Sequence, residues 1–150
     1  MNPFELLKKD HEKVSGLMKR LETTTERGVR TRQDLFKQLK EELDIHAHIE
    51  ETIFYPALQI ETETEDITRE ALEEHKIVKT LLSELERMSK DDEQWSAKFM
   101  VLKENVEHHV EEEEGEMFTK ARKALGKEEL DELGEEMNEE KKRMMAGVTE

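Results

Sequence analysis

Hydrophobic residues recur every three or four positions along almost the whole chain, which is the period of an α-helix. No segment alternates between hydrophobic and polar residues over the length that a strand would need. Breaks in the pattern near Gly28, Thr62 and Asp91 separate four long helical segments. We therefore expect an all-α fold, an up-down-up-down four-helix bundle in which sequential helices pack antiparallel.

Capping signals predict where the helices begin. Asn2 precedes Pro3, so that a cap residue is followed by the one helical position where proline costs nothing. The other three helices are predicted to begin at Thr31 with Asp34, at Thr62 with Glu65, and at Asp91 with Gln94, and to end near residues 58, 88 and 125.

A weaker helical pattern follows the four long segments. Gly126 ends the fourth helix, and the next segment carries a thin apolar stripe from Lys127 to about Met145. We expect residues 1–125 to form the bundle and residues 126–150 a short C-terminal helical appendage. The stripe could pack across its own bundle, or residues 127–145 could form an oligomer contact.

The sequence contains an internal repeat. A shift of 63 residues sets His46, Glu50 and Glu51 on His109, Glu113 and Glu114. A shift of 64 residues sets the pair Asp10-His11 on Glu74-His75. The chain is therefore expected to consist of two helical hairpins of similar design.

Composition excludes several classes of protein. The formal net charge is −15, so we expect no nucleic acid and no anionic membrane as a partner. No apolar run approaches the roughly 20 residues of a membrane helix, and the first residues lack the apolar stretch of a signal peptide, so a cytoplasmic protein is expected. The absence of cysteine excludes disulfides, thiolate metal sites and thiol catalysis. Leu, Ile, Val and Phe make up 34 of the 150 residues, just above the fraction of about one fifth below which highly charged chains tend to be disordered.

Histidines and glutamates interrupt the apolar faces of all four helices. A lone core histidine is more often simply packed, and a single His-x-x-x-Glu pair is more often an exposed ion pair. Here the interruptions occur in both halves of a repeat, and two inward carboxylates without a partner would cost several kcal/mol each. A cation is therefore expected between them. The predicted metal ligands are His11, His46, Glu50, His75, His109 and Glu113.

Two other histidines are assigned differently. His108 with Glu112 is a second candidate pair, but only the register of His109 matches the first repeat. His48 is expected to be solvated, because it lies about 200° around the helix from His46. Glu51 and Glu114, next to the predicted ligands, are expected at the rim of the site or directly behind the ligands, and Tyr55 is expected to be an interfacial aromatic residue.

Four neutral nitrogens and two carboxylates form a ligand set that suits iron, manganese or zinc. Two ions fit this set better than one, because each carboxylate can bridge. A bridging oxo or hydroxo group and at least one open position would remain. Dioxygen, peroxide, nitric oxide or azide-like anions could bind at such an open position.

At these residues the chain resembles the hemerythrin-like family, also called the HHE cation-binding domain, over about residues 1–125. The family's signature is His, then His-x-x-x-Glu, then His, then His-x-x-x-Glu, one element per helix. Matching segments are Asp10-His11, HAHIEETIFYP from His46, Glu73-Glu74-His75, and HVEEEEGEMF from His109. The resemblance implies a non-haem diiron centre with imidazoles from His11, His46, His75 and His109 and bridging carboxylates from Glu50 and Glu113.

One departure from the family bears on function. Oxygen-carrying hemerythrins have a fifth histidine one turn from its partner, and the two positions one turn from His75 are Ala71 and Lys79.

The leading hypothesis is a diiron protein that binds dioxygen, peroxide, nitric oxide or a related oxidant for sensing, scavenging or storage. Two alternatives stay open: an enzyme with peroxidase, catalase-like or ferroxidase activity, and an interaction module whose metal is structural.

Overall fold

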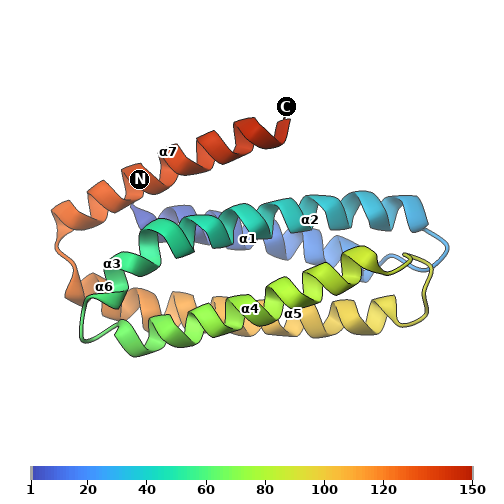
Figure 1. Ribbon diagram of the computed structural model, residues 1–150, viewed down its shortest axis with the longest axis horizontal. Coiled ribbons are helices and arrows are strands. Elements are labelled where there is room, and N and C mark those ends of the chain that lie inside the picture. Colours follow the sequence, from blue (N-terminus) through green and yellow to red (C-terminus); the bar gives the residue numbers. More distant parts are fainter. Residues whose placement is uncertain (1, 150) are drawn as a thin grey trace.

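The computed structural model describes residues 2–149, and over these residues it contains helices but no strand. Four helices form an antiparallel bundle, and the predicted fold class is confirmed (Figure 1). These are α1 (Pro3–Glu22), α2 (Val29–Ile49), α4 (Glu65–Arg87) and α5 (Trp95–Glu112). Two of them continue through a π-helical turn, α2 through η1 (Glu50–Phe54) into α3 (Tyr55–Gln59) and α5 through η2 (Glu113–Met117) into α6 (Phe118–Ala124). No helix in the described part of the chain is long and apolar enough to cross a membrane.

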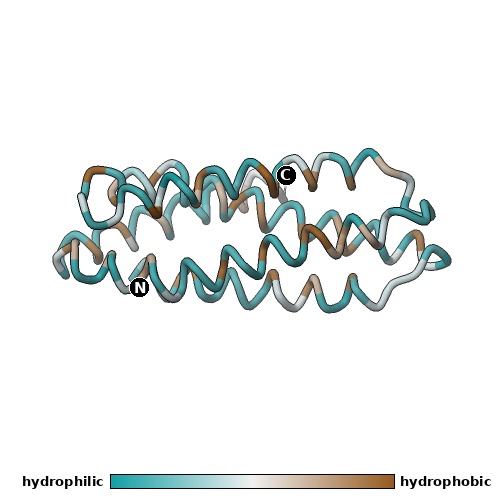
Figure 2. The backbone as a smooth tube through the Cα atoms, turned by 90° about the horizontal axis from the view of Figure 1, so that it is seen from below, coloured by the Kyte–Doolittle hydropathy of each residue, from teal (hydrophilic) through white to brown (hydrophobic). Residues whose placement is uncertain are grey.

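The apolar core of the bundle is divided into two clusters. Hydrophobic positions recur at intervals along helices that are otherwise hydrophilic (Figure 2). One cluster lies at the end where Phe4 packs on Phe118, with ring centroids 4.9 Å apart. The other lies at the opposite end, where Trp95 stacks on Phe99 with centroids 5.6 Å apart. On each long helix the predicted histidine falls between residues of the two clusters, so a polar layer crosses the middle of the bundle.

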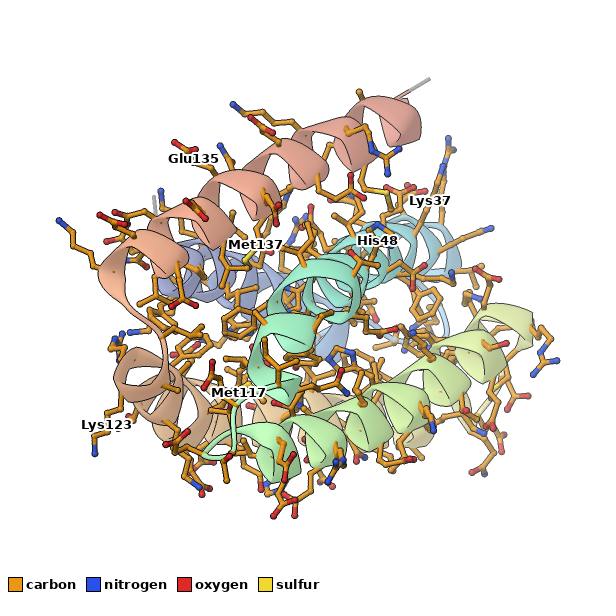
Figure 3. The ribbon with its side chains drawn as sticks, turned by 60° about the vertical axis from the view of Figure 1, so that its left-hand side comes forward. Lys37, His48, Met117, Lys123, Glu135 and Met137 are labelled. Carbon is orange, nitrogen blue, oxygen red and sulfur yellow. The ribbon has the colours of Figure 1, made fainter. Side chains whose placement is uncertain are left out.

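The long C-terminal helix, α7 (Lys127–Thr149), lies along α1 and α2 (Figure 1). Met137 is fully buried against the first cluster and points into the bundle, whereas Glu135 points away (Figure 3). Leu130, Leu133 and Met144 are partly buried on the same cluster. The apolar stripe therefore packs on its own bundle, as one of the two expected arrangements.

The predicted start of the first bundle helix is confirmed, and the predicted starts of the other three are wrong. The Asn2 side chain accepts a hydrogen bond of 2.9 Å from the backbone N–H of Glu5, as expected of a cap. The second helix begins at Val29 without a side-chain cap, and the fourth begins at Trp95 rather than near Asp91. The cap of α4 is Thr64, not Thr62, and its hydroxyl donates to the Leu58 carbonyl at 2.5 Å instead of capping the helix.

Arg32, in the first turns of α2, is buried between two loops. Its guanidinium is buried (1% exposed) and donates to the Thr24 carbonyl at 2.9 Å and to the Lys90 carbonyl at 2.8 Å. It also donates to the Ser96 hydroxyl at 3.2 Å and lies 4.6 Å from the centre of the Trp95 ring. The side chain thus ties the loop after α1 to the loop before α5.

We predict that Arg32→Leu lowers the free energy of unfolding by about 3 kcal/mol, because it removes two hydrogen bonds from a charged donor to partly buried carbonyls. The melting temperature should fall by roughly 6–12 °C in a domain of this size. Thermal circular dichroism measures the change, and Arg30→Leu serves as the exposed control. A fall no larger than that of the control would contradict the role of Arg32.

Candidate metal centre

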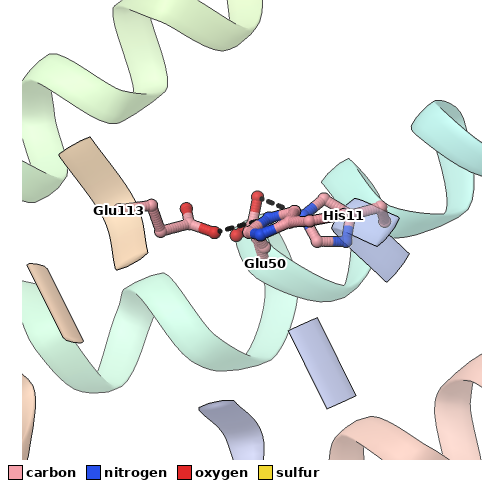
Figure 4. A group of neighbouring side chains, drawn as sticks. His11, Glu50 and Glu113 are labelled. Carbon is pink, nitrogen blue, oxygen red and sulfur yellow. Dashed lines mark ion pairs between the residues drawn. The ribbon is translucent and has the colours of Figure 1, made fainter. Parts of the chain in front are cut away.

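All six predicted metal ligands meet in the polar layer, and each is at most 7% exposed. Their potential ligand atoms form two groups in which all atoms lie within 4.8 Å of one another. The first group is His11, His46, Glu50 and Glu113, and the second is Glu50, His75 and His109. Because Glu50 belongs to both groups, the two groups are adjacent. Figure 4 shows His11, Glu50 and Glu113 of the first group close together.

Each imidazole turns its Nε2 atom towards a central carboxylate. The distances are 3.2 Å from His11 to Glu113 Oε1, 3.3 Å from His46 to Glu50 Oε1, 3.0 Å from His75 to Glu50 Oε1, and 3.2 Å from His109 to Glu113 Oε2. Two ligand atoms that each lie about 2.1 Å from one ion, at right angles, stand about 3 Å apart. The spacing therefore fits ligands that share an ion.

Hydrogen bonding supports the same fit. Among the described residues, the Nε2 atoms of His11 and His46, both oxygens of Glu50 and Oε1 of Glu113 are buried without a hydrogen-bond partner. The distances from these imidazole nitrogens to the carboxylate oxygens are those of ion pairs, but the geometry between them is not that of a hydrogen bond. Buried carboxylate oxygens without a partner are costly. A bound cation would satisfy all five atoms, so the residues present fit a metal.

The other nitrogen of each imidazole, Nδ1, faces a carboxylate at the outside of the centre. The pairs are His11 with Glu114 at 2.6 Å, His46 with Asp10 at 2.9 Å, His75 with Glu51 at 2.8 Å, and His109 with Glu74 at 2.8 Å. Such contacts fix the ring orientation and leave Nε2 free to bind metal.

Two of these outer carboxylates were expected at the rim, and two were missed. Glu51 and Glu114 lie where the sequence placed them. Asp10 and Glu74 were not assigned a role, although each directly precedes a predicted ligand at corresponding positions of the repeat. An acidic residue before a core histidine was the signal that could have identified them.

The contacts follow the two-fold pattern of the repeat. Asp10 of α1 holds His46 of α2, and Glu74 of α4 holds His109 of α5 in the same way. The remaining two carboxylate–imidazole contacts cross between the hairpins, from Glu51 to His75 and from Glu114 to His11. Each hairpin therefore orients a histidine of the other.

Both central glutamates stand at the first position of a π-helical turn, at Glu50 of η1 and at Glu113 of η2. The backbone N–H of Tyr55 donates to the Glu50 carbonyl, five residues earlier, and that of Phe118 donates to the Glu113 carbonyl. The wider turn brings the residue five positions after each glutamate back to the inner face. The predicted helix pattern assumed ordinary α-helical turns here and missed both.

Tyr55 is the functional residue that the sequence misplaced. It was expected at an interface, but it is fully buried, and its hydroxyl donates to Glu113 Oε2 at 2.5 Å. The hydroxyl also lies 3.3 Å from Nε2 of both His75 and His109. Burial raises the pKa of Tyr55 well above its ordinary value, as do the charges of Glu113 and Glu50, so the hydroxyl stays protonated.

The central carboxylates govern the protonation of the imidazoles in the metal-free protein. Burial lowers the pKa of His109, but its contacts with Glu113 and Glu74 outweigh burial and raise that pKa to about 10. The pKa of His46 is likewise raised well above its ordinary value, against the effect of burial, by Glu50 and Asp10. A metal ion must therefore displace protons from these rings.

Of the two remaining histidines, His48 was predicted wrongly and His108 correctly. His48 was expected to be solvated, but it is half-buried on the side of α2 that faces α7 (Figure 3). Its Nε2 lies 2.7 Å from Glu140 of α7. The α7 helix covers this side of α2, which the helical period alone could not reveal. His108 is exposed and lies 3.1 Å from Glu112, so His109 is the histidine that faces inward.

A cavity of about 40 Å³ adjoins the imidazoles. The four ring-bearing ligands contribute to it, and most of the rest of its wall is aliphatic. The aliphatic lining consists of Val14, Leu43, Ala47, Val78, Leu82, Val106 and Val110. A space of this size accepts a molecule of a few atoms.

Several known proteins are similar to this chain. An uncharacterized protein of Mycobacterium tuberculosis, Rv2633c, is 30% identical over 91% of this chain and 83% of its own length. A DNA nickase of a Nostoc species is 26% identical over 96% of this chain, which spans only 40% of that protein. A crystal structure of a hemerythrin HHE cation binding domain-containing protein from Mycobacterium kansasii, a Rv2633c homolog, superposes with a TM-score of 0.87 and 29% identity, covering 99% of this chain and 90% of that one.

The model of one protein family matches most of the chain. That family is described as the hemerythrin HHE cation binding domain, and the match runs over residues 2–121, which includes all four bundle helices and both groups of potential ligands. With the fold and the His/Glu clusters in agreement, the chain belongs to the hemerythrin HHE cation-binding domain family and is a metal-binding, hemerythrin-like protein.

Proposed function

We propose that this protein holds two iron ions in its polar layer and binds dioxygen, peroxide, nitric oxide or a related small oxidant there, for sensing, scavenging or storage. His11 and His46 would hold one ion, and His75 and His109 the other. Glu50 and Glu113 would be shared between them. The observation that carries the proposal is that two adjacent ligand groups share Glu50 beside a small apolar cavity.

The number of ligands supports a centre with room for a further molecule. Four nitrogens and two bridging carboxylates supply about eight bonds, whereas two six-coordinate ions accept about twelve. When bound, the metal pair would supply the electrons and open positions for oxidant chemistry. The chain's own side chains shape the space: the mostly aliphatic walls leave room only for a small molecule, and the imidazoles face the same cavity of about 40 Å³.

Metal analysis with absorption spectroscopy tests this proposal. Iron-supplemented protein should retain about two iron ions per chain and show a near-ultraviolet charge-transfer band that changes when azide or nitric oxide is added. Glu50→Ala should retain less than one, because Glu50 serves both positions. His108→Ala, which changes an exposed histidine, should behave like the wild type. Less than one iron per chain in the wild type, or a preference for manganese or zinc, would contradict the diiron proposal.

Peroxide turnover is a second candidate function, favoured by the Tyr55 hydroxyl at the centre. This hydroxyl donates its one hydrogen to Glu113 Oε2, and it could turn that hydrogen bond to a peroxide molecule bound beside Glu113. We predict that Tyr55→Phe lowers oxygen evolution from peroxide at least tenfold while leaving the iron content unchanged. Oxygen-electrode assays with metal analysis measure both. A wild-type rate equal to that of free iron would reject turnover, and an unchanged rate in Tyr55→Phe would reject the role of its hydroxyl.

The pKa of His109 also predicts how stability depends on pH. Its pKa is raised to about 10 in the folded metal-free protein, against an ordinary value of about 6.5 when unfolded. The stability that this proton contributes is complete below about pH 6.5 and is lost as the pH rises towards 10. Metal binding releases the proton and becomes tighter over the same range.

We therefore expect the melting temperature of metal-free protein to fall between pH 6 and pH 9.5, while that of iron-loaded protein changes less. The gap between the two forms should widen with pH. Thermal unfolding of both forms in matched buffers measures this gap. A metal-free melting temperature that rises across the range would be inconsistent with the raised pKa of His109.

A further inference from the structure

The inward face of α7 is interrupted by charged residues in the same way as the faces of the bundle helices. Met137 and Met144 lie on this face, and between them it carries Glu140 and Lys141. Both of these residues contact the bundle. Glu140 Oε2 lies 2.7 Å from His48 Nε2, and the Lys141 ammonium donates a short hydrogen bond to Asp10.

Asp10 divides its two oxygens between α7 and the metal centre. Its Oδ2 faces Nδ1 of His46 at 2.9 Å, and its Oδ1 accepts the hydrogen bond from Lys141. The carboxylate is only 3% exposed. The other three outer carboxylates, Glu51, Glu74 and Glu114, have side chains that are 25–34% exposed. Water can therefore solvate those three, whereas Asp10 depends on its two protein partners.

We propose that Lys141 is a positioning residue for the metal position of His11 and His46, acting through Asp10 and the His46 ring. This rests on the metal site proposed above. The ammonium holds the buried carboxylate in the orientation that aims Nε2 of His46 at the centre. Docking of α7 and occupation of this one metal position are then coupled, and each favours the other.

The other ligand group offers a comparison. Lys79 donates to Glu51 at 2.8 Å, and Glu51 faces His75 at 2.8 Å, so the same three kinds of group lie in the same order. The Lys79 side chain is 50% exposed, whereas that of Lys141 is 24% exposed. Water can replace Lys79, so its removal should matter little.

The experiment uses the full chain loaded with iron and measures iron release to a coloured chelator. In Lys141→Gln, one iron per chain should leave about tenfold faster than in the wild type, and the second at the wild-type rate. Lys141→Arg should restore slow release. The control is Lys142→Gln, which changes an exposed neighbour on α7 and should behave like the wild type. Lys79→Gln is the comparison at the His75 position and should not speed release of the iron held by His11 and His46.

Amide hydrogen exchange gives a second readout, which is independent of activity. Iron loading should slow exchange in α7 of the wild type and should do so less in Lys141→Gln. Equal release from the wild type and Lys141→Gln, or equal acceleration of both irons, would overturn the inference, because Lys141 would then have no effect or only a general structural one. A wild type that retains no iron would instead overturn the proposed function.

Discussion

Two carboxylates buried at the centre of a four-helix bundle are the constraint on which the rest of the structure depends. Glu50 and Glu113 are at most 1% exposed, and three of their four oxygens have no hydrogen-bond partner among the described residues. Such groups need positive charge nearby. Each bundle helix contributes one imidazole to this layer. The four rings lie between the two apolar clusters, so they divide the core. The low content of large apolar residues then follows, because part of the core is a polar layer whose cation would contribute to stability.

The repeat makes the two ligand groups similar, and two departures from it make them different. Tyr55 in the first half stands where Phe118 stands in the second, so one hydroxyl enters the centre from one side, close to His75 and His109. Asp10 is buried and held by α7, whereas its counterpart Glu74 is partly exposed. A chain with exact internal symmetry would offer a ligand two equal positions. This chain offers one beside a hydroxyl and one tied to a peripheral helix.

The sequence was sufficient for the fold and for the meeting of the six residues, because both depend only on helical period and on a repeat. A histidine that replaces an apolar residue at the same depth in both halves has to face inward wherever the helices begin. The sequence was insufficient where the local backbone geometry departs from the α-helical period. Five residues along an α-helix is about 140° around its axis, so Tyr55 would point away from Glu50 without the π-helical turn.

The same limit applies to contacts that come from elsewhere in the fold. His48 lies on the outer face of α2 by its period, and only the position of α7 covers it. The capping prediction at Thr62 was wrong: Thr64 takes the cap position of α4, and its hydroxyl donates to the Leu58 carbonyl of α3. In both cases the pattern along one helix could not show a contact that a second segment of the chain makes with it.

The surroundings of the centre narrow the choice between binding an oxidant and turning it over. The cavity walls are aliphatic apart from the imidazoles, Asp44 and Lys79, so they can confine a small molecule but supply few groups that exchange a proton with it. The Tyr55 hydroxyl lies against Glu113 and two imidazoles, and it stays protonated because burial and the adjacent carboxylates raise its pKa. A protonated donor held against a carboxylate is the minimum that proton transfer requires. Under the proposed function, turnover of an oxidant rather than its binding alone would depend on this one hydroxyl group, which the π-helical turn brings to the centre.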